Sequence, residues 1–259
     1  MVAPLQRWLL GKFLEGREFV HTVDAGPATG LRYPITLPQD KGIWTGTYEV
    51  ELARRIAAAV RPGTVCLDIG GWRGFFSGVM ALAGASKILV FEPLPANATQ
   101  IRRTLELNPK LSIELIEAAV GETEGRLEFV VMPESSMGKL AASSFQAEQR
   151  GGQKISVRVV AVDELIATGK FAPPAMLKID VEGAEMFVLR GARQLLAARK
   201  PELFIEVHSP ALAKECDAFL TGLGYEILIL EKLAPETAHG NPEICHFIAR
   251  ARSPHSTLP

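Results

Sequence analysis

Short apolar runs alternate with helix-forming segments along most of this chain, and this alternation limits its fold more than any other feature. We expect buried strands at residues 65–69, 87–91, 113–120, 176–179, 203–207, 226–230 and 246–249. Helices are expected at residues 49–60, 75–83, 96–107, 186–198 and 211–223. Such alternation is typical of a doubly wound α/β fold, in which helices cover both faces of a mostly parallel sheet. The last two strands have no helix between them, which favours one antiparallel strand near the C-terminal end of a seven-stranded sheet.

Two segments interrupt this pattern. Residues 1–44 contain an apolar stretch at 8–14, typical of a short amphipathic helix, and then the turn-forming residues Pro27, Gly30, Pro34, Pro38 and Gly42. They predict an N-terminal extension of loops and short strands, followed by one α/β domain over residues 45–259. Two β-like runs, at 126–132 and 155–162, surround a Ser-, Gly- and Gln-rich stretch at 135–153. We expect an inserted β-ribbon with a mobile loop that could act as a lid.

Composition excludes several classes of protein. The chain has 28 Lys and Arg against 29 Asp and Glu, a net charge of −1, which argues against a surface built to coat nucleic acid. Cys66, Cys216 and Cys245 have no Cys-x-x-Cys spacing, so we expect reduced thiols rather than disulfides or a zinc site. No apolar run approaches the roughly 20 residues that cross a bilayer, and the N-terminal stretch is too short and too charged for a signal peptide. The expectation is a cytoplasmic protein without stable membrane insertion.

A glycine-rich turn follows the first expected strand, at Gly70, Gly71 and Gly74. In a doubly wound fold this turn lies at the ligand crevice, where glycine lets the backbone approach a ligand. Glu92 ends the second strand 22 positions after Gly70, which is where an acid accepts hydrogen bonds from ribose hydroxyls. The two features together indicate an adenosine-containing ligand. The alternative is an ordinary tight turn that binds nothing.

The same turn discriminates between adenosine ligands. A dinucleotide site needs a second glycine where this chain has Trp72, so a pyrophosphate loop is not formed. Asp68, two residues before the first glycine, fits poorly beside a pyrophosphate and well beside a ligand with positive charge. S-adenosylmethionine carries an ammonium and a sulfonium. The turn therefore favours S-adenosylmethionine over a nicotinamide dinucleotide.

With these features the chain resembles class I S-adenosylmethionine-dependent methyltransferases, and specifically the FkbM family. The resemblance covers roughly residues 45–208 and is carried by the segments 46–49, 67–77, 90–95, 177–185, 188–192 and 201–206. The most specific is Lys-Ile-Asp-Val-Glu-Gly-Ala-Glu, at 178–185. The chain departs from the family at Gly71 and Trp72, where Ala-Asn is usual. Trp72 could therefore stack on the cofactor, line one side of its pocket, or pack under the loop.

The resemblance implies an O-methyltransferase domain over residues 45–259, acting on a sugar hydroxyl of a polysaccharide, a glycolipid or a natural product. The expected partner is a small-molecule or glycan acceptor, with no nucleic acid, and the N-terminal extension is a candidate homodimer contact. The implied cofactor contacts are Tyr48, Asp68, Gly70, Gly71, Trp72, Gly74, Phe75, Glu92, Pro93, Asn97, Ala118, Ala119 and Asp180. Two alternatives stay open: a catalytically silent cofactor-binding or assembly module, and a nicotinamide-dependent oxidoreductase.

Polar residues follow the fourth and fifth strands of the expected sheet. Asp180 and Glu182 come after one strand, and Glu206 and His208 end the next. The carboxyl ends of parallel strands meet at the ligand crevice, so these four residues are the candidate catalytic groups. We expect His208, neutral at pH 7 and oriented by Glu206 or Asp180, to take the proton of the acceptor hydroxyl. The competing hypothesis makes Asp180 or Glu182 the base.

Structural roles remain open for the same residues. Lys178 and Asp180 could form an ion pair, Glu185 could favour only the dipole of its helix, and His208 could mark a helix entry. We expect no metal ion at this site. The alternative is a magnesium or manganese site, since carboxylates with one histidine suit these ions, and its ligands would be Asp180, Glu182, Glu206 and His208.

Overall fold

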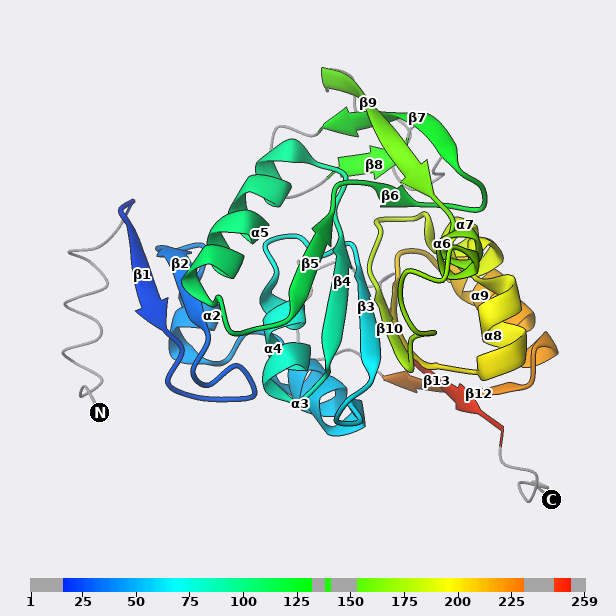
Figure 1. The fold of residues 1–259 in the computed structure, drawn as a ribbon, viewed down its shortest axis with the longest axis horizontal. Coiled ribbons are helices and arrows are strands. Elements are labelled where there is room, and N and C mark those ends of the chain that lie inside the picture. The colour runs from blue at the N-terminus through cyan, green and yellow to red at the C-terminus, as the bar shows by residue number, and fades with distance from the viewer. Residues whose placement is uncertain (1–15, 132–137, 141–152, 231–244, 253–259) are drawn as a thin grey trace.

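The computed structural model describes residues 16–131, 138–140, 153–230 and 245–252 of the chain. A seven-stranded sheet crosses the molecule (Figure 1), with the strand order β12-β13-β11-β10-β3-β4-β5. Its strands are β3 (Val65–Ile69), β4 (Lys87–Phe91), β5 (Ile113–Ile116), β10 (Met176–Ile179), β11 (Glu202–Val207), β12 (Tyr225–Leu230) and β13 (Cys245–Ala251). Strand β13 is antiparallel to both of its neighbours, and the other pairings are parallel. The predicted doubly wound fold is confirmed.

Apolar side chains on the two faces of this sheet form two separate cores. One contains Leu67 and Leu177 and packs against α7 (Glu185–Gly191), α8 (Arg193–Arg199) and α9 (Pro210–Gly222). The other contains Cys66 and Met176 and packs against α3 (Val50–Ala59) and α4 (Phe75–Leu82). Neighbouring residues of a strand point to opposite faces, so a strand covered on both faces is apolar throughout.

The described part of the N-terminal extension contributes to the second core. It forms an antiparallel pair of strands, β1 (Glu18–Thr22) and β2 (Arg32–Thr36), followed by α2 (Lys41–Thr45). The pair lies beside α5 (Pro95–Leu107), and the backbone N–H of Arg32 donates to the side chain of Asn108 at 3.0 Å. Leu31 packs so closely on α4 that a methyl group on Gly78 would lie 2.7 Å from it. The expected helix at residues 8–14 lies outside the described residues.

A smaller four-stranded sheet corresponds to the predicted inserted ribbon. Its strands, in the order β6-β9-β7-β8, are β6 (Ala119–Val120), β9 (Gln153–Val160), β7 (Gly125–Val131) and β8 (Gly138–Leu140). In Figure 1 this sheet lies beyond the end of the main sheet toward which β4 and β5 point. Most of the predicted loop at 135–153 lies outside the described residues, so the lid stays a prediction.

The structure corrects three details of the prediction. The expected strand at 113–120 is divided into β5 and β6, which belong to different sheets. The expected helix at 186–198 is divided at Ala192, whose φ and ψ are −111° and 11°. The short helix α6 (Val162–Ala167) was not expected, and its Asp163 carboxylate accepts the N–H groups of Gln194 and Leu195 at the start of α8. This contact between distant segments stabilises a second helix start that local periodicity does not reveal.

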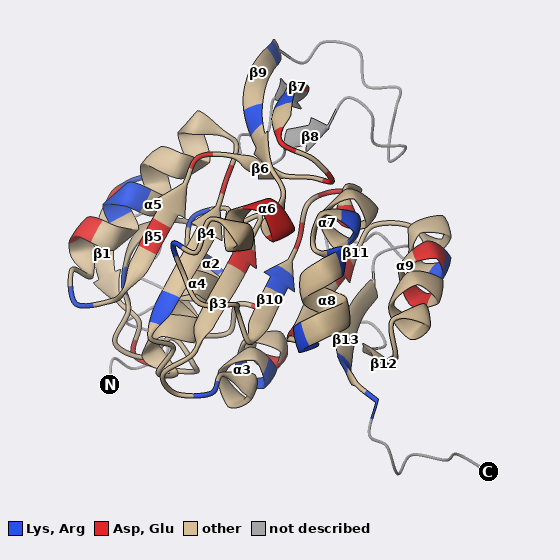
Figure 2. Cartoon of the chain, turned by 45° about the vertical axis from the view of Figure 1, so that its right-hand side comes forward, with Lys and Arg blue, Asp and Glu red and all other residues tan. Residues whose placement is uncertain are grey.

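Charged residues of both signs are spread over the helices and strands that Figure 2 shows, in agreement with the balanced composition. Within the described ranges, no helix has both the length and the apolar character needed to cross a membrane.

Candidate active site

The glycine turn after β3 packs directly against the end of β10. The N–H groups of Gly70 and Gly71 both donate to the carbonyl of Phe91, each at 3.0 Å. Gly70 has a φ of +81°, and a methyl group there would lie 1.7 Å from the carbonyl oxygen of Asp180. Only glycine fits both conditions. The turn is thereby held between the carboxyl ends of β3, β4 and β10.

Asp68 and Lys178 occupy paired positions on β3 and β10, under this turn. Ser77 donates its hydroxyl to Asp68 Oδ2 at 2.6 Å, and Lys178 Nζ lies 3.8 Å from Oδ1. Oδ1 is buried and accepts no hydrogen bond from the described part of the chain. Burial raises the pKa of Asp68, against the opposing charge of Lys178. A buried acceptor at the crevice is therefore available to a donor other than those of the described residues.

Lys178 lies between the carboxylates of Asp68 and Asp180. Its ammonium donates to the carbonyl of Gly70 at 3.2 Å and to Asp180 Oδ2 at 3.0 Å. Burial disfavours the charge on Lys178, but the carboxylates of Asp180 and Asp68 outweigh this effect and raise its pKa. Burial likewise opposes the charge on Asp180, and Lys178 outweighs it, so the pKa of Asp180 is lowered. The ion pair left open by the sequence is present.

Glu92 follows β4 and holds the turn against the start of α5. Its Oε2 accepts the N–H of Trp72 at 2.9 Å, and its Oε1 accepts the N–H of Leu94 at 3.0 Å and Asn97 Nδ2 at 3.3 Å. The residue is 4% exposed, and burial raises its pKa to about 7 although these donors favour the carboxylate. Each carboxylate oxygen can accept two hydrogen bonds, so Oε2 has capacity for one more donor.

Trp72 packs against aromatic side chains beside the turn. Its ring stacks on Tyr48 with centroids 5.9 Å apart, and Tyr48 meets Phe75 edge-on at 5.1 Å. Trp72 has a φ of +49°, a conformation that costs free energy outside glycine. The remaining predicted cofactor residues lie at the ends of neighbouring elements: Gly74 precedes α4, Pro93 follows Glu92, Ala118 is buried between β5 and β6, and Ala119 begins β6.

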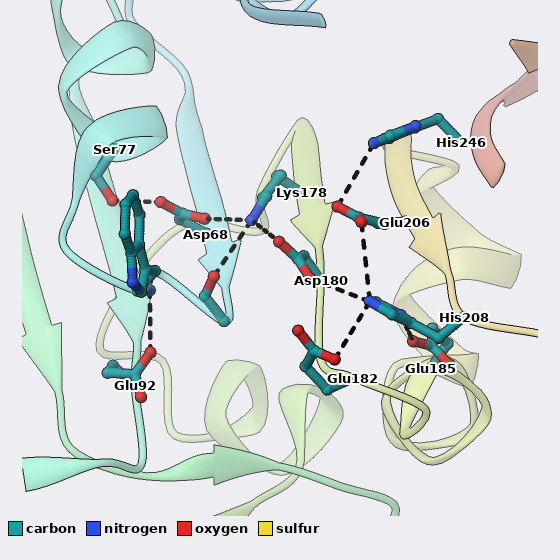
Figure 3. A network of polar contacts seen from close by, with 12 residues as sticks. Asp68, Ser77, Glu92, Lys178, Asp180, Glu182, Glu185, Glu206, His208 and His246 are labelled. Carbon is teal, nitrogen blue, oxygen red and sulfur yellow. Dashed lines mark hydrogen bonds and ion pairs between the residues drawn. The ribbon is translucent and has the colours of Figure 1, made fainter. Parts of the chain in front are cut away.

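The carboxylates of three candidate catalytic residues converge on the imidazole of the fourth, His208. His208 Nε2 lies 3.8 Å from Asp180 Oδ1, 3.7 Å from Glu182 Oε2 and 3.8 Å from Glu206 Oε1 (Figure 3). His208 is only 1% exposed, whereas the side chains of Glu182 and Glu206 are 24% and 21% exposed. Two partly exposed carboxylates thus cover a buried histidine.

The expected orienting partner of His208 is wrong. Its orienting partner is neither Glu206 nor Asp180 but Glu185, whose Oε1 lies 2.7 Å from His208 Nδ1. Burial alone would lower the pKa of His208, but the bond to Glu185 and the charge of Asp180 outweigh it and raise the pKa to about 9. In the absence of a metal ion, this shift favours an imidazolium at pH 7 over the neutral ring expected from the sequence. Glu185 also accepts the N–H of Gly183 at 3.0 Å, so it does more than complement a helix dipole.

Sequence reasoning missed other residues at this site. Glu49 precedes α3 with a φ of +38°, and burial together with the charges of Glu206 and Asp180 raises its pKa to about 7. The segment 46–49 that carries the resemblance contains Glu49, and this was the available signal. His246 Nε2 lies 3.5 Å from Glu206 Oε2, and nothing in the sequence spacing indicates that contact.

A family model and a curated protein are similar to this chain. A family model described as the methyltransferase FkbM domain matches residues 68–227. The hexuronic acid methyltransferase AglP of Haloferax volcanii is 22% identical over 173 residues, which are 67% of this chain and 68% of AglP.

Two solved structures align with this chain at low sequence identity. The methyltransferase FkbM from Methylobacillus flagellatus has a TM-score of 0.49 and 16% identity over 81% of this chain, which spans 55% of that one. A tRNA (uracil-54, C5)-methyltransferase of Pyrococcus abyssi, solved with S-adenosyl-L-homocysteine, has a TM-score of 0.50 and 14% identity. It is matched over 90% of this chain and 44% of its own length.

Proposed function

Because the chain belongs to the FkbM methyltransferase family, we propose that it transfers a methyl group from S-adenosylmethionine to a hydroxyl of a sugar, a glycolipid or a natural product. The observation that supports this proposal is that two groups of residues lie close together. The glycine turn and Glu92 lie at the same sheet edge as the carboxylates around His208 (Figure 3). A cofactor crevice and a group of proton acceptors are thus adjacent.

The residues of the crevice fit S-adenosylmethionine. The buried Asp68 Oδ1 has no hydrogen-bond donor among the described residues, which suits the ammonium of the cofactor. Glu92 Oε2 retains one acceptor position for a ribose hydroxyl. The turn has no side chain at Gly70 and so leaves its backbone open to close approach. When bound, S-adenosylmethionine supplies a methyl carbon on a sulfonium, which ends as a neutral thioether.

The acceptor hydroxyl must lose a proton as its oxygen gains the methyl group. Glu182 and Glu206 would take it, because both are partly exposed carboxylates beside His208. His208 is buried, and its raised pKa favours an imidazolium when no metal ion is bound, so in that state it would support these carboxylates instead of acting as the base. Holding the acceptor oxygen in line with the methyl group would supply much of the rate.

The substrate class follows from similarity alone. AglP is named for its action on a hexuronic acid, and at 22% identity it makes a sugar acceptor the first to test. The direct test incubates the protein with S-adenosylmethionine and glycans that contain uronic acids or neutral sugars, and it measures S-adenosylhomocysteine. Calorimetry with S-adenosylmethionine and NAD separates the alternatives. Binding of NAD alone would indicate an oxidoreductase, and cofactor binding without transfer to any acceptor would indicate a silent module.

A further inference from the structure

We propose that Asp180, Glu182 and His208 bind a divalent metal ion. Within the described residues, one carboxylate oxygen from each acid and one ring nitrogen of His208 all lie within 4.8 Å of one another. This differs from the expectation of a metal-free site. The metal site itself is independent of the methyltransferase proposal, and only its role in catalysis rests on that function.

The spacing of the donor atoms is the first argument. His208 Nε2 lies 3.7 Å from Glu182 Oε2 and 3.8 Å from Asp180 Oδ1, and both distances exceed that of a hydrogen bond. Two ligand atoms that are each about 2.1 Å from one ion can be up to about 4.2 Å apart. The observed separations therefore suit atoms that share an ion better than atoms that bond to each other.

The orientation of His208 is the second argument. Glu185 Oε1 lies 2.7 Å from Nδ1, which turns Nε2 toward Asp180 and Glu182. A metal-binding histidine commonly donates a hydrogen bond from its other ring N–H to a carboxylate, which fixes both the ring orientation and the tautomer. Because His208 and Glu185 are fully buried, this orientation is fixed before any ion arrives.

Charge is the third argument. Four carboxylates surround the ring of His208, those of Asp180, Glu182, Glu185 and Glu206. Lys178 pairs with Asp180, and even with a charged ring at His208 the four acids outnumber the two cations. Closely spaced carboxylates repel one another, and a divalent cation would reduce this repulsion.

The donor set indicates the kind of ion and its role. Carboxylates with a single imidazole suit Mg²⁺ or Mn²⁺. Three protein ligands leave positions open, and two neighbouring oxygens of a sugar acceptor fit such positions. The ion would polarise the acceptor O–H bond. Glu206 stands outside the three ligands and would receive the proton, while the acceptor oxygen forms its bond to the methyl carbon and the carbon–sulfur bond breaks.

The test measures Mn²⁺ binding to the full chain by electron paramagnetic resonance, without cofactor or acceptor. We expect one saturable site, and Glu182→Gln and Asp180→Asn should each weaken binding by about 10–100-fold or more. Glu202→Gln is the matched control, because Glu202 lies at the opposite end of β11 and pairs with Arg250. This variant should bind Mn²⁺ like the wild type. Near-ultraviolet circular dichroism of each variant reports on its fold.

A second measurement needs no variant. Bound Mn²⁺ should broaden the ring resonances of His208 and leave those of His21, on β1, sharp. Absence of saturable binding in the wild type, or equal affinity of Glu182→Gln and Glu202→Gln, would overturn the site, as would sharp His208 resonances. Methyl transfer that persists in a chelator would overturn the catalytic role of the ion and leave the proposed methyltransferase function intact.

Discussion

His208 Nδ1 and Glu185 Oε1 lie 2.7 Å apart in a buried pair that joins the end of β11 to the start of α7. The pair connects β11, which carries Glu206 and leads into His208, to α7, which follows the loop that contains Asp180 and Glu182. Glu185 is thus a positioning residue, which acts on the site through the ring of His208. An acid at the first position of a helix would not by itself reveal this role.

The first prediction concerns the protonation of His208 in protein freed of divalent ions. Because Glu185 and Asp180 raise its pKa to about 9, the ring should be an imidazolium at pH 7.5. Glu185→Gln removes a hydrogen-bonded charge and should lower that pKa, which a histidine NMR titration measures. Glu202→Gln serves as the control and should leave it unchanged. A neutral ring in the wild type at pH 7.5 would return His208 to the role of general base.

The second prediction concerns Glu92 and the cofactor. Glu92→Gln keeps an acceptor for the turn but removes the charge, and it should weaken S-adenosylmethionine binding by about 1.5–3 kcal/mol. Calorimetry on the folded variant measures this loss. Unchanged affinity would remove Glu92 from the ribose site.

A pH dependence follows from the same residue. The pKa of Glu92 is raised to about 7, so the carboxylate that accepts a ribose hydroxyl is lost as the pH falls through 7. Affinity for S-adenosylmethionine should therefore weaken between pH 8 and pH 6. Below the pKa, the loss should be at most about tenfold for each pH unit. Glu49 titrates in the same range, and Glu92→Gln separates the two: the wild-type slope should flatten in this variant. An equal slope in both proteins would contradict the assignment.

The third prediction compares two glycines with positive φ. Gly70→Ala places a methyl group 1.7 Å from the carbonyl of Asp180, so it should destabilise the fold by more than about 4 kcal/mol or prevent folding. Gly169 has a φ of +69° and nothing within 4 Å, so Gly169→Ala should cost only about 1–2 kcal/mol. Chemical denaturation measures both. Similar losses in the two variants would show that the turn does not need its close approach.

The fourth prediction concerns the division between α7 and α8. Asp163→Ala removes the acceptor for Gln194 and Leu195 N–H and should lower the free energy of unfolding by about 0.5–2 kcal/mol. Affinity for S-adenosylmethionine should stay unchanged, since α8 contributes no residue to the crevice described above. A loss of cofactor binding at full stability would argue for a coupling that these contacts do not explain.

The buried strands of the main sheet were predictable because they are apolar on both faces. The bounds of β3, β4 and β10 match the prediction residue for residue, and each is bracketed by turn residues. The end of β5 at Ile116 and the division between α7 and α8 at Ala192 were not predictable from the sequence, because contacts with distant segments produce them. A methyl group on Gly191, for example, would lie 2.0 Å from the carbonyl of Gly121.

The same distinction holds for the site. The rule that parallel strands end at a common edge was enough to bring Asp180, Glu182, Glu206 and His208 together. It could not assign Glu185 to His208, since that pairing depends on how α7 is placed against β11. Nor could it give the charge of His208, because the pKa depends on burial and on three neighbouring acids at once.

The most direct test of the central claim follows an isotope-labelled methyl group. The protein is incubated with labelled S-adenosylmethionine and a panel of glycans rich in uronic acids and neutral sugars, and the products are analysed by mass spectrometry and NMR. We predict that the label appears as a methyl ether on a sugar oxygen, with equal formation of S-adenosylhomocysteine. Label that remains entirely in S-adenosylmethionine, or that reaches nitrogen or carbon instead of oxygen, would contradict the account.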